Sequence, residues 1–446
     1  MQSTTRQLSL HSRNLRILCA QHVCLLVAGS LSLGLYTSWA VLSDTDGAVT
    51  VYHLWMVVAL ASTLCIVVWN DYRCRNQTIP FSLLLAFAIA FRLVGIGAFP
   101  ILEDDFYRFL WDGRTFVTLG SPYDLVPEDF FAGDFGATYN WILGQINHPD
   151  IATVYGPSAQ WVFALSYLIA PGEVWPLQLL IASADIWLIV LLCKFTSTNN
   201  VLLYAWCPLV IKETVFSVHF DGIGACLLIA AWLCCHRNRF YLAGMLLAMA
   251  AGIKVFALVA IPFFLRFHWR GWLAFLAGAI LISIPFGILP AWLPSGLEAM
   301  NTQWLFNAPM YSLLLNAFSY SMVKALLQGV FILGWAWYLT RQLFFADSRQ
   351  HPRLDWVFAG LLLCIPALNP WYLLWLLPFA VINPSRWAWA SATCVLLAYA
   401  IGLNLPEQNL SPYEQLPLTM LIEFSLIAFA LFLDLRSRAN RATRSS

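Results

Sequence analysis

The chain has 446 residues, of which 60% are hydrophobic and only 11% are charged, and its mean hydropathy is +0.71. This composition excludes a water-soluble globule of that length, because too few polar side chains are present to cover its surface. The formal net charge of +1 provides no basic face, so nucleic acid is excluded as a partner. The composition predicts a protein that lies in membrane lipid.

Apolar segments recur along most of the chain without the alternation that barrel strands would show. A helix needs about 20 apolar residues to cross a bilayer core, so these segments predict an all-α, polytopic membrane protein with about 11 to 14 transmembrane helices. No soluble domain is apparent, and residues 1–446 are expected to form one membrane-embedded unit. The segments cover, in chain order, residues 17–42, 51–70, 80–100, 157–171, 177–195, 200–211, 214–236, 241–267, 272–290, 311–340, 355–369, 370–384, 387–404 and 417–435.

Basic residues indicate the orientation of these segments. Arg73 with Arg75 and Arg237 with Arg239 are expected on the cytoplasmic side, since cytoplasmic loops are enriched in Lys and Arg. Both termini are then cytoplasmic, and the segment Ile101–Tyr155 is an extracytoplasmic loop.

Two regions cannot consist of simple spans. Four apolar segments within residues 157–236 must connect an external loop to an internal Arg237, so one of them is expected not to be a full span. Residues 241–267 have basic residues on both flanks but are too short for two crossings. A broken hairpin around Gly252 and Lys254 would solve this problem.

The external loop is strongly acidic. It contains nine of the 23 acidic residues of the chain, including the adjacent Glu103, Asp104 and Asp105. Loops commonly carry charge, but three neighbouring carboxylates repel one another unless a cation or a substrate compensates, which favours an active site. A carboxylate there is able to accept the proton of an attacking sugar hydroxyl, while a nearby Arg or Lys stabilises a phosphate leaving group.

The spacing after these acids predicts a short helix. In a helix, Asp105, Arg108 and Asp112 are separated by three and four residues and share one face, so Arg108 would orient or neutralise the acids.

Charged residues within apolar segments form a second group of candidates. Lys212 and Glu213, followed by His219 and Asp221, are either structural pairs or the wall of a polar cavity, because unpaired charges are costly in lipid. His219 and Asp221 alone are a weak set of metal ligands. Lys254 either extends to the interface or binds a phosphate at the break in the hairpin.

A third group is Asn369-Pro370-Trp371-Tyr372, where Pro370 interrupts two apolar runs. The freed backbone groups and the aromatic faces are suited to line a sugar site, although Trp and Tyr also favour membrane interfaces.

In these motifs the sequence resembles the polyprenyl-phosphate-sugar-dependent glycosyltransferases of the GT-C superfamily, in particular bacterial mannosyltransferase-like multi-pass proteins. The motifs follow the order of that family, although Ser121 and Gly156 stand where its pattern often has Asn and Pro. The residues that carry the resemblance are Asp104-Asp105-Phe106-Tyr107-Arg108-Phe109-Leu110-Trp111-Asp112-Gly113-Arg114, Gly120-Ser121-Pro122-Tyr123, Tyr155-Gly156-Pro157, Lys212-Glu213, His219-Phe220-Asp221, Gly252-Ile253-Lys254 and Asn369-Pro370-Trp371-Tyr372.

The resemblance implies a GT-C-type bundle in the bacterial cytoplasmic membrane whose first extracytoplasmic loop is catalytic. It implies inverting transfer of a hexose, with mannose as the leading sugar, from a polyprenyl-phosphate donor to an envelope glycan or glycolipid. Asp104 or Asp105 would be the catalytic base. The residues expected to bind substrate are Tyr107, Arg108, Asp112, Arg114, Tyr155, Lys212, Glu213, His219, Asp221, Lys254, Asn369, Trp371 and Tyr372.

No cofactor is expected by this resemblance. Members that use lipid-monophosphate donors generally need no metal, because Arg or Lys neutralises a single phosphate, although an acidic pair is also able to hold Mg²⁺ or Mn²⁺.

The main alternative is a secondary transporter, in which Asp185, His219, Asp221 and Lys254 would form a path through the membrane. The concentration of charge in one external loop and the lack of an internal repeat favour the transferase. A glycan polymerase or ligase would need Arg and His in a late external loop, and residues 291–310 and 405–416 contain neither. A scaffold would leave the acidic triplet unexplained.

Overall fold

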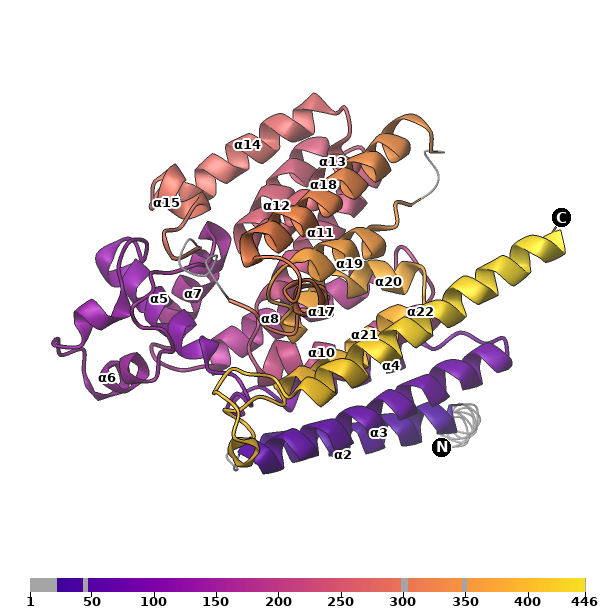
Figure 1. The fold of residues 1–446 in the computed structure, drawn as a ribbon, viewed down its shortest axis with the longest axis horizontal. Coiled ribbons are helices and arrows are strands. Elements are labelled where there is room, and N and C mark those ends of the chain that lie inside the picture. Colours follow the sequence, from indigo (N-terminus) through magenta and orange to yellow (C-terminus); the bar gives the residue numbers. More distant parts are fainter. Residues whose placement is uncertain (1–21, 43–46, 298–303, 347–350, 446) are drawn as a thin grey trace, which may run out of the picture.

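The computed structural model describes residues 22–42, 47–297, 304–346 and 351–445, and these residues form a helical bundle (Figure 1). Within these residues the only β-type pairing consists of two isolated bridges. The first part of the bundle contains α2 (Val23–Leu42), α3 (Gly47–Cys74), α4 (Phe81–Leu93), α5 (Asp105–Leu119), η1 (Pro127–Phe130), α6 (Ala137–Gly144), α7 (Pro157–Ile169), α8 (Trp175–Leu192), α9 (Thr198–Ala205), α10 (Pro208–Ile211), the π-helix η2 (Lys212–Phe216), α11 (Asp221–His236) and α12 (Phe240–Ile253).

The second part is more often interrupted. It contains η3 (Val255–Val259), α13 (Ile261–Leu265), α14 (Trp269–Ser283), α15 (Ile288–Trp292), α17 (Pro309–Leu314), α18 (Tyr320–Phe344), α19 (Leu354–Cys364), η4 (Pro370–Trp375), α20 (Leu377–Ile382), α21 (Arg386–Cys394), η5 (Val395–Tyr399), η6 (Pro406–Gln408) and α22 (Pro417–Ser445).

The protein is an all-α membrane protein, as predicted. Five helices within the described residues are long and apolar enough to cross a membrane, and α10–η2 with α11 form a sixth candidate that is bent by 116°. Four more apolar helices are shorter, namely α4, α12, α14 and α19. The total of about 11 to 14 spans stays a prediction, because it depends on how the short and broken helices cross the bilayer.

The two irregular regions follow the expected pattern. Residues 200–236 form the short α9 and α10, a π-helical turn and then α11, so the segment 200–211 is not one continuous span. The helix α12 ends at Ile253, and Lys254 is extended, with φ −156° and ψ 137°, before η3 begins. The stacking of Phe240 on His268, with ring centres 3.6 Å apart, brings the two ends of this segment together, so the broken hairpin around Gly252 and Lys254 is present.

Other predicted boundaries were wrong. The segment 80–100 is helical only to Leu93, because turns and a left-handed Gly97 (φ +84°) follow. The segment 311–340 is two helices, since α17 ends at Leu314 and α18 begins only at Tyr320. The predicted first span began at residue 17, and its residues before 22 lie outside the described part of the chain.

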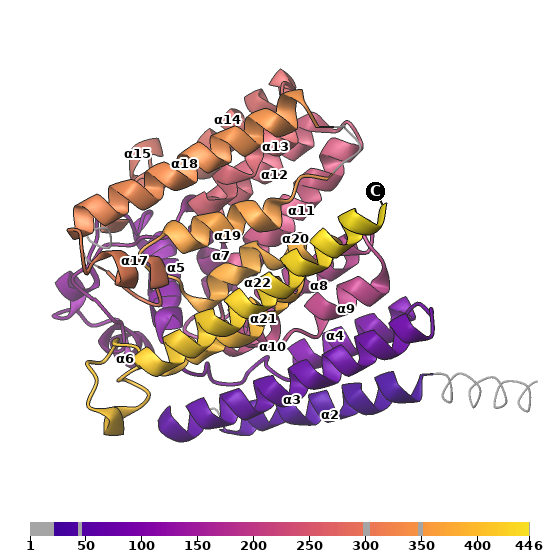
Figure 2. The ribbon, with the colours of Figure 1, turned by 45° about the vertical axis from the view of Figure 1, so that its right-hand side comes forward.

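The ends of the bundle differ in character. The first turns of α2 and the end of α22 lie at one end, whereas α5 and α6 lie at the other (Figures 1 and 2). The acidic segment Ile101–Tyr155 is thus placed opposite the two terminal helix ends. Which of these two ends faces the cytoplasm stays a prediction.

A buried ion pair joins α4 to α8 within the bundle. Arg92 Nε donates to Asp185 at 2.8 Å, and a terminal guanidinium nitrogen of Arg92 lies 2.7 Å from the same carboxylate oxygen. Tyr204 donates to the other oxygen of this carboxylate at 2.6 Å. Arg92 also donates to the carbonyl oxygens of Ala88 and Ala205. Because both charged side chains are excluded from solvent, each depends on the other to compensate its charge.

We expect Asp185→Asn to destabilise the protein by about 3 kcal/mol or more, because it leaves the buried Arg92 charge without its counter-ion. Thermal unfolding of the purified protein in detergent measures the effect. Asp71→Asn is the matched control, since it breaks the exposed pair with Arg75 and should cost less than about 1 kcal/mol. Equal melting temperatures for Asp185→Asn and the wild type would contradict a stabilising role of this pair.

Candidate active site

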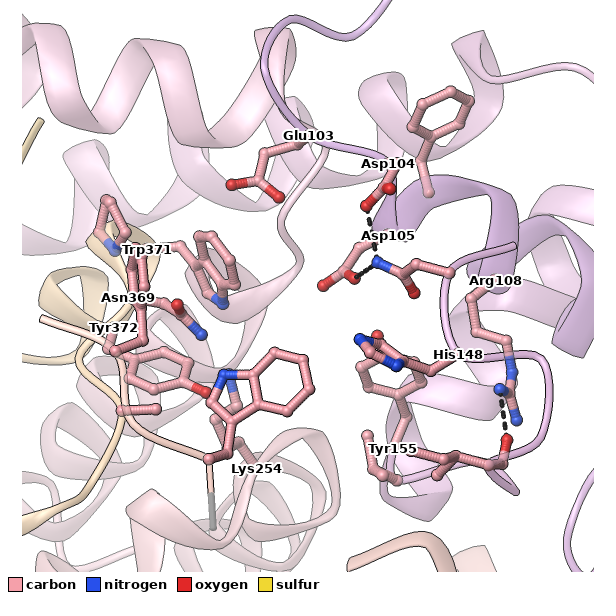
Figure 3. Close-up of a pocket in the computed structure, with 18 of the residues that line it drawn as sticks. Glu103, Asp104, Asp105, Arg108, His148, Tyr155, Lys254, Asn369, Trp371 and Tyr372 are labelled. Atoms are coloured by element: carbon pink, nitrogen blue, oxygen red, sulfur yellow. Dashed lines mark hydrogen bonds between the residues drawn. The ribbon is translucent and has the colours of Figure 1, made fainter. Parts of the chain in front are cut away.

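A cavity of about 800 Å³ lies next to the start of α5 (Figure 3). Its walls come from the segment before α5, the loop before α7, the break after α12 and the start of η4. It also receives residues from the loops around Trp304 and Tyr413. Segments from all parts of the chain therefore meet at one site.

The three acids form one wall of this cavity. Asp104 is the N-cap residue of α5 and Asp105 is the first helical residue, so both carboxylates lie where the helix dipole favours negative charge. Asn147 donates to Asp104 at 2.7 Å and to Asp105 at 3.4 Å. The backbone N–H of Ile101 donates to the carbonyl of Phe216 at 2.7 Å, which anchors the segment before the acids.

The environment keeps two of these carboxylates from ionising at their usual pH. Burial and the neighbouring Asp105 charge raise the pKa of Asp104 to about 6, while the hydrogen bond from Asn147 opposes the increase. Burial raises the pKa of Glu103 well above its usual value, and the charge of Lys212 lowers it in part. Asp104 therefore changes its ionisation close to neutral pH.

Lys254 lies on the opposite side of the cavity (Figure 3). Its ammonium donates to Asp221 at 2.7 Å and lies 4.2 Å from the centre of the Tyr372 ring. Trp375 Nε1 donates to the same oxygen of Asp221 at 2.6 Å. Lys254 is thus held toward the cavity by a buried carboxylate and an aromatic face.

Trp371 and Tyr372 continue this wall together with Asn369. Trp371 stacks on His219 with ring centres 3.7 Å apart, and His219 shares a hydrogen bond of 2.9 Å with Glu213. Because η4 begins with Pro370, the aromatic side chains follow a backbone break, as the sequence indicated. His219 fixes the plane of Trp371 from behind.

The predicted polar residues of the central segment lie behind the wall. Lys212, Glu213, His219 and Asp221 are buried and none of them lines the cavity. Lys212 contacts Glu213 at 3.3 Å and lies over the ring of Tyr399. The sequence left two roles open for these residues, structural pairs or the wall of a polar cavity. In the structure they form buried pairs.

The predicted helix face on α5 is present, and Arg108 pairs with Asp112, one of the two acids on that face. Arg108 lines the cavity and forms an ion pair of 2.8 Å with Asp112, so it does not neutralise Asp104 or Asp105. Asp112 also accepts hydrogen bonds from Thr153 at 2.5 Å and from Gln160 at 3.2 Å. This network joins α5 to the loop before α7.

Arg114 lies away from the cavity and packs its guanidinium 4.4 Å from the centre of the Phe135 ring. Like Asp112, it is placed to support the loop rather than to contact a substrate. Tyr107 and Tyr155, in contrast, line the cavity as predicted.

Gly156 explains how the loop comes so close to the break after α12. A Cβ at Gly156 would collide with the carbonyl oxygen of Gly252, and a Cβ at Gly252 would collide with Ser158. Two glycines therefore allow the backbones next to Tyr155 and Lys254 to touch.

Several lining residues were missing from the predicted site. Asn147, His148, Trp304, Tyr399 and Tyr413 all line the cavity, and Glu103 was noted only as part of the acidic triplet. His148 packs against Trp304 and Tyr413, with ring centres 4.9 and 5.7 Å away. With 21 Trp and 16 Tyr in the chain, no sequence signal separates these aromatic residues from those facing lipid.

No group of three or more His, Cys, Asp and Glu side chains in the described part of the chain has the geometry of a metal site. Whether the reaction needs a metal is a separate question, and its independence of metals stays a prediction.

The helical membrane bundle thus contains a cavity with three acids on one wall and a lysine and aromatic side chains on the opposite wall. The family model described as alpha-(1->6)-mannopyranosyltransferase, N-terminal domain, matches residues 17–270, which is more than half of the chain. The chain belongs to this family and is a glycosyltransferase that transfers mannose. No curated protein and no solved structure matches it at a significant level.

The matched region contains the acidic wall, the loop before α7 and Lys254. It excludes Asn369, Trp371 and Tyr372, so the rest of the cavity comes from the later part of the chain.

We expect mannosyl transfer to increase as the pH rises through about 6, because only the ionised form of Asp104 accepts a proton. In Asn147→Ala the inflection of the pH–rate profile should move to higher pH, since the hydrogen bond that lowers the pKa of Asp104 is lost. In Asp105→Asn the inflection of the residual activity should move to lower pH, since a neighbouring negative charge is removed. The measurement is the transfer rate at saturating donor over this pH range. Shifts of the inflection in the same direction in the two variants would contradict the assignment of this inflection to Asp104.

Proposed function

We propose that this mannosyltransferase takes mannose from a polyprenyl-phosphate donor and transfers it with inversion to a hydroxyl of an envelope glycan or glycolipid. The observation that carries the proposal is the placement of Asp104 and Asp105 across one cavity from Lys254 (Figure 3). A base on one side and a cation on the other are the two groups that displacement of a phosphate needs.

Lys254 is the proposed binding group for the donor phosphate. Its ammonium has three donors, and Asp221 takes one of them, which leaves N–H groups for phosphate oxygens. Arg108 is the other permanent cation among the lining residues, and its charge is already paired with Asp112. Lys254 is paired as well, but its side chain keeps 19% of its surface exposed, compared with 9% for Arg108.

Asp104 is the proposed base. The acceptor hydroxyl oxygen forms a bond to the anomeric carbon of mannose, and the bond from that carbon to the phosphate oxygen breaks. The hydroxyl proton passes to Asp104, and polyprenyl phosphate leaves toward Lys254. Attack and departure on opposite faces of the sugar produce inversion. A pKa of about 6 suits this role, since general bases work best near the ambient pH.

Asp105 is proposed to support this step. Its charge raises the pKa of Asp104, and Asn147 bridges the two carboxylates. The aromatic faces of Trp371 and Tyr372 are proposed to pack against the sugar rings.

The name of the family supports a (1→6) linkage, in which the acceptor offers a primary hydroxyl at carbon 6. The proposed location is the bacterial cytoplasmic membrane, with cytoplasmic termini and an extracytoplasmic cavity. The opposite placement of the acidic loop and the terminal helix ends supports this orientation (Figures 1 and 2). We propose that no metal takes part, because Lys254 supplies the charge that a single phosphate needs.

The contacts do not favour a transporter. Asp185 is paired with Arg92, and His219 and Asp221 are bound to Glu213 and Lys254. Within the described residues these charged groups are paired with one another and, apart from Lys254, do not line the cavity. A transport path would need groups that exchange partners with a substrate or a proton.

Asp104→Asn is expected to reduce transfer by about 1000-fold, because the amide cannot accept the proton. Asp105→Asn should reduce the transfer rate by about tenfold, since it changes only the environment of the base. Asp129→Asn, an exposed acid of the same loop outside the cavity, should retain wild-type activity. Transfer of radiolabelled mannose from polyprenyl-phosphate-mannose in nanodiscs measures all three variants. Greater loss in Asp105→Asn than in Asp104→Asn would assign the base to Asp105.

Lys254→Ala should raise the KM for the donor by about tenfold or more, because a charge-assisted contact to phosphate is lost. Lys254→Arg should retain part of the affinity, as it keeps the charge. The control is Lys194→Ala, which removes an exposed lysine outside the cavity. An unchanged donor KM in Lys254→Ala would exclude Lys254 as the phosphate ligand.

A further inference from the structure

A second cavity, of about 1200 Å³, lies between α3, α9, α21 and α22. It is lined by the last turns of α3 and by residues up to Ser437 of α22, which place it toward the end of the bundle opposite α5 (Figures 1 and 2). It shares no lining residue with the cavity beside α5. The transfer reaction therefore does not account for it.

The polar part of this cavity has a net positive charge. Arg73 lies over the ring of Trp69, 4.9 Å from its centre, and makes no ion pair within the described residues. Arg386 is exposed and contacts Asp434 at 3.5 Å. The lining thus contains two guanidinium groups and one carboxylate, and this excess of positive charge favours an anionic ligand.

Two hydrogen-bond donors in this wall have no partner among the residues that the structure describes. The Ser385 hydroxyl belongs to a side chain that is only 7% exposed, and it makes no hydrogen bond. The indole N–H of Trp389 is also buried without a partner. Both residues line the cavity. Buried polar groups are almost always satisfied, so two unsatisfied donors in one wall indicate an acceptor-rich ligand.

Most of the remaining lining surface is apolar, although Ser62, Asn70 and Asn199 also contribute to it. Its apolar part includes Ala59 and Ile66 of α3 and Leu426 and Ala430 of α22. Both helices are long and apolar enough to span the membrane. A soluble anion would leave these walls unfilled, whereas an acyl chain would cover them.

We propose that this second cavity binds an anionic glycerophospholipid from the leaflet next to Arg73. Its phosphodiester pairs with Arg73 and Arg386, and its ester carbonyls accept hydrogen bonds from Ser385 and Trp389. Its acyl chains lie between α3 and α22. Trp69 and Trp389 are suited to this depth, because Trp favours the region between head groups and hydrocarbon.

The test is native mass spectrometry of the full chain in detergent, titrated separately with phosphatidylglycerol, phosphatidylcholine and inorganic phosphate. The wild type should retain phosphatidylglycerol in preference to the other two. Arg73→Ala combined with Ser385→Ala should weaken this binding by about tenfold or more. The matched control is Arg341→Ala, since Arg341 also lies over a tryptophan, 5.9 Å from Trp337, but lines neither cavity. The Arg341→Ala variant should bind phosphatidylglycerol as tightly as the wild type does.

Equal binding of phosphatidylglycerol by the double variant and the wild type would overturn the proposal. Equal affinity for phosphatidylcholine would contradict the proposal that the ligand must be anionic. Equal affinity for inorganic phosphate would contradict the proposal that the ligand is a lipid. A photoactivatable phosphatidylglycerol provides a test that needs no variant. It should label peptides of α3 or α22 that line the cavity, and labelling confined to other regions would also overturn the proposal.

Discussion

The pairing of charges inside a low-dielectric bundle is the constraint on which the rest of this structure depends. An unpaired charge is costly in lipid, so each buried cation in the described part of the chain is held by a carboxylate: Arg92 by Asp185, Arg108 by Asp112 and Lys212 by Glu213. The partly exposed Lys254 is held by Asp221 in the same way. Two of these pairs join different helices, since Arg92–Asp185 links α4 to α8 and Lys254–Asp221 links the end of α12 to α11. The second pair also holds Lys254 at the wall of the cavity.

The cavity is assembled where regular helices stop. Glu103 to Asp105 precede and begin α5, Lys254 follows the end of α12, and Trp371 follows the break at Pro370. A continuous helix satisfies its own backbone and buries its side chains against neighbours, so a polar cavity in a membrane protein is easiest to form at such breaks. The contact between Gly156 and Gly252 then brings two of these breaks together.

Much of this arrangement followed from the sequence. Hydropathy predicted an all-α membrane protein, and basic residues on both flanks of residues 241–267 predicted the break near Lys254. The separations of three and four residues between Asp105, Arg108 and Asp112 predicted the helix α5. The order of short motifs predicted the family, which the match to residues 17–270 confirmed. These features are local, since they depend on neighbouring residues and on the thickness of the bilayer.

Pairing partners and side-chain direction were decided only by the tertiary structure. The sequence grouped Lys212, Glu213, His219 and Asp221 with the site, but packing placed them behind its wall. It did not single out Asn147, Trp304 or Tyr413, because amide and aromatic residues in loops carry no periodic signal. The sequence by itself determined the class of protein, the candidate acids and the breaks at Lys254 and Pro370. Which of these groups face one another depended on contacts between segments far apart in the chain, and no local pattern specifies such contacts.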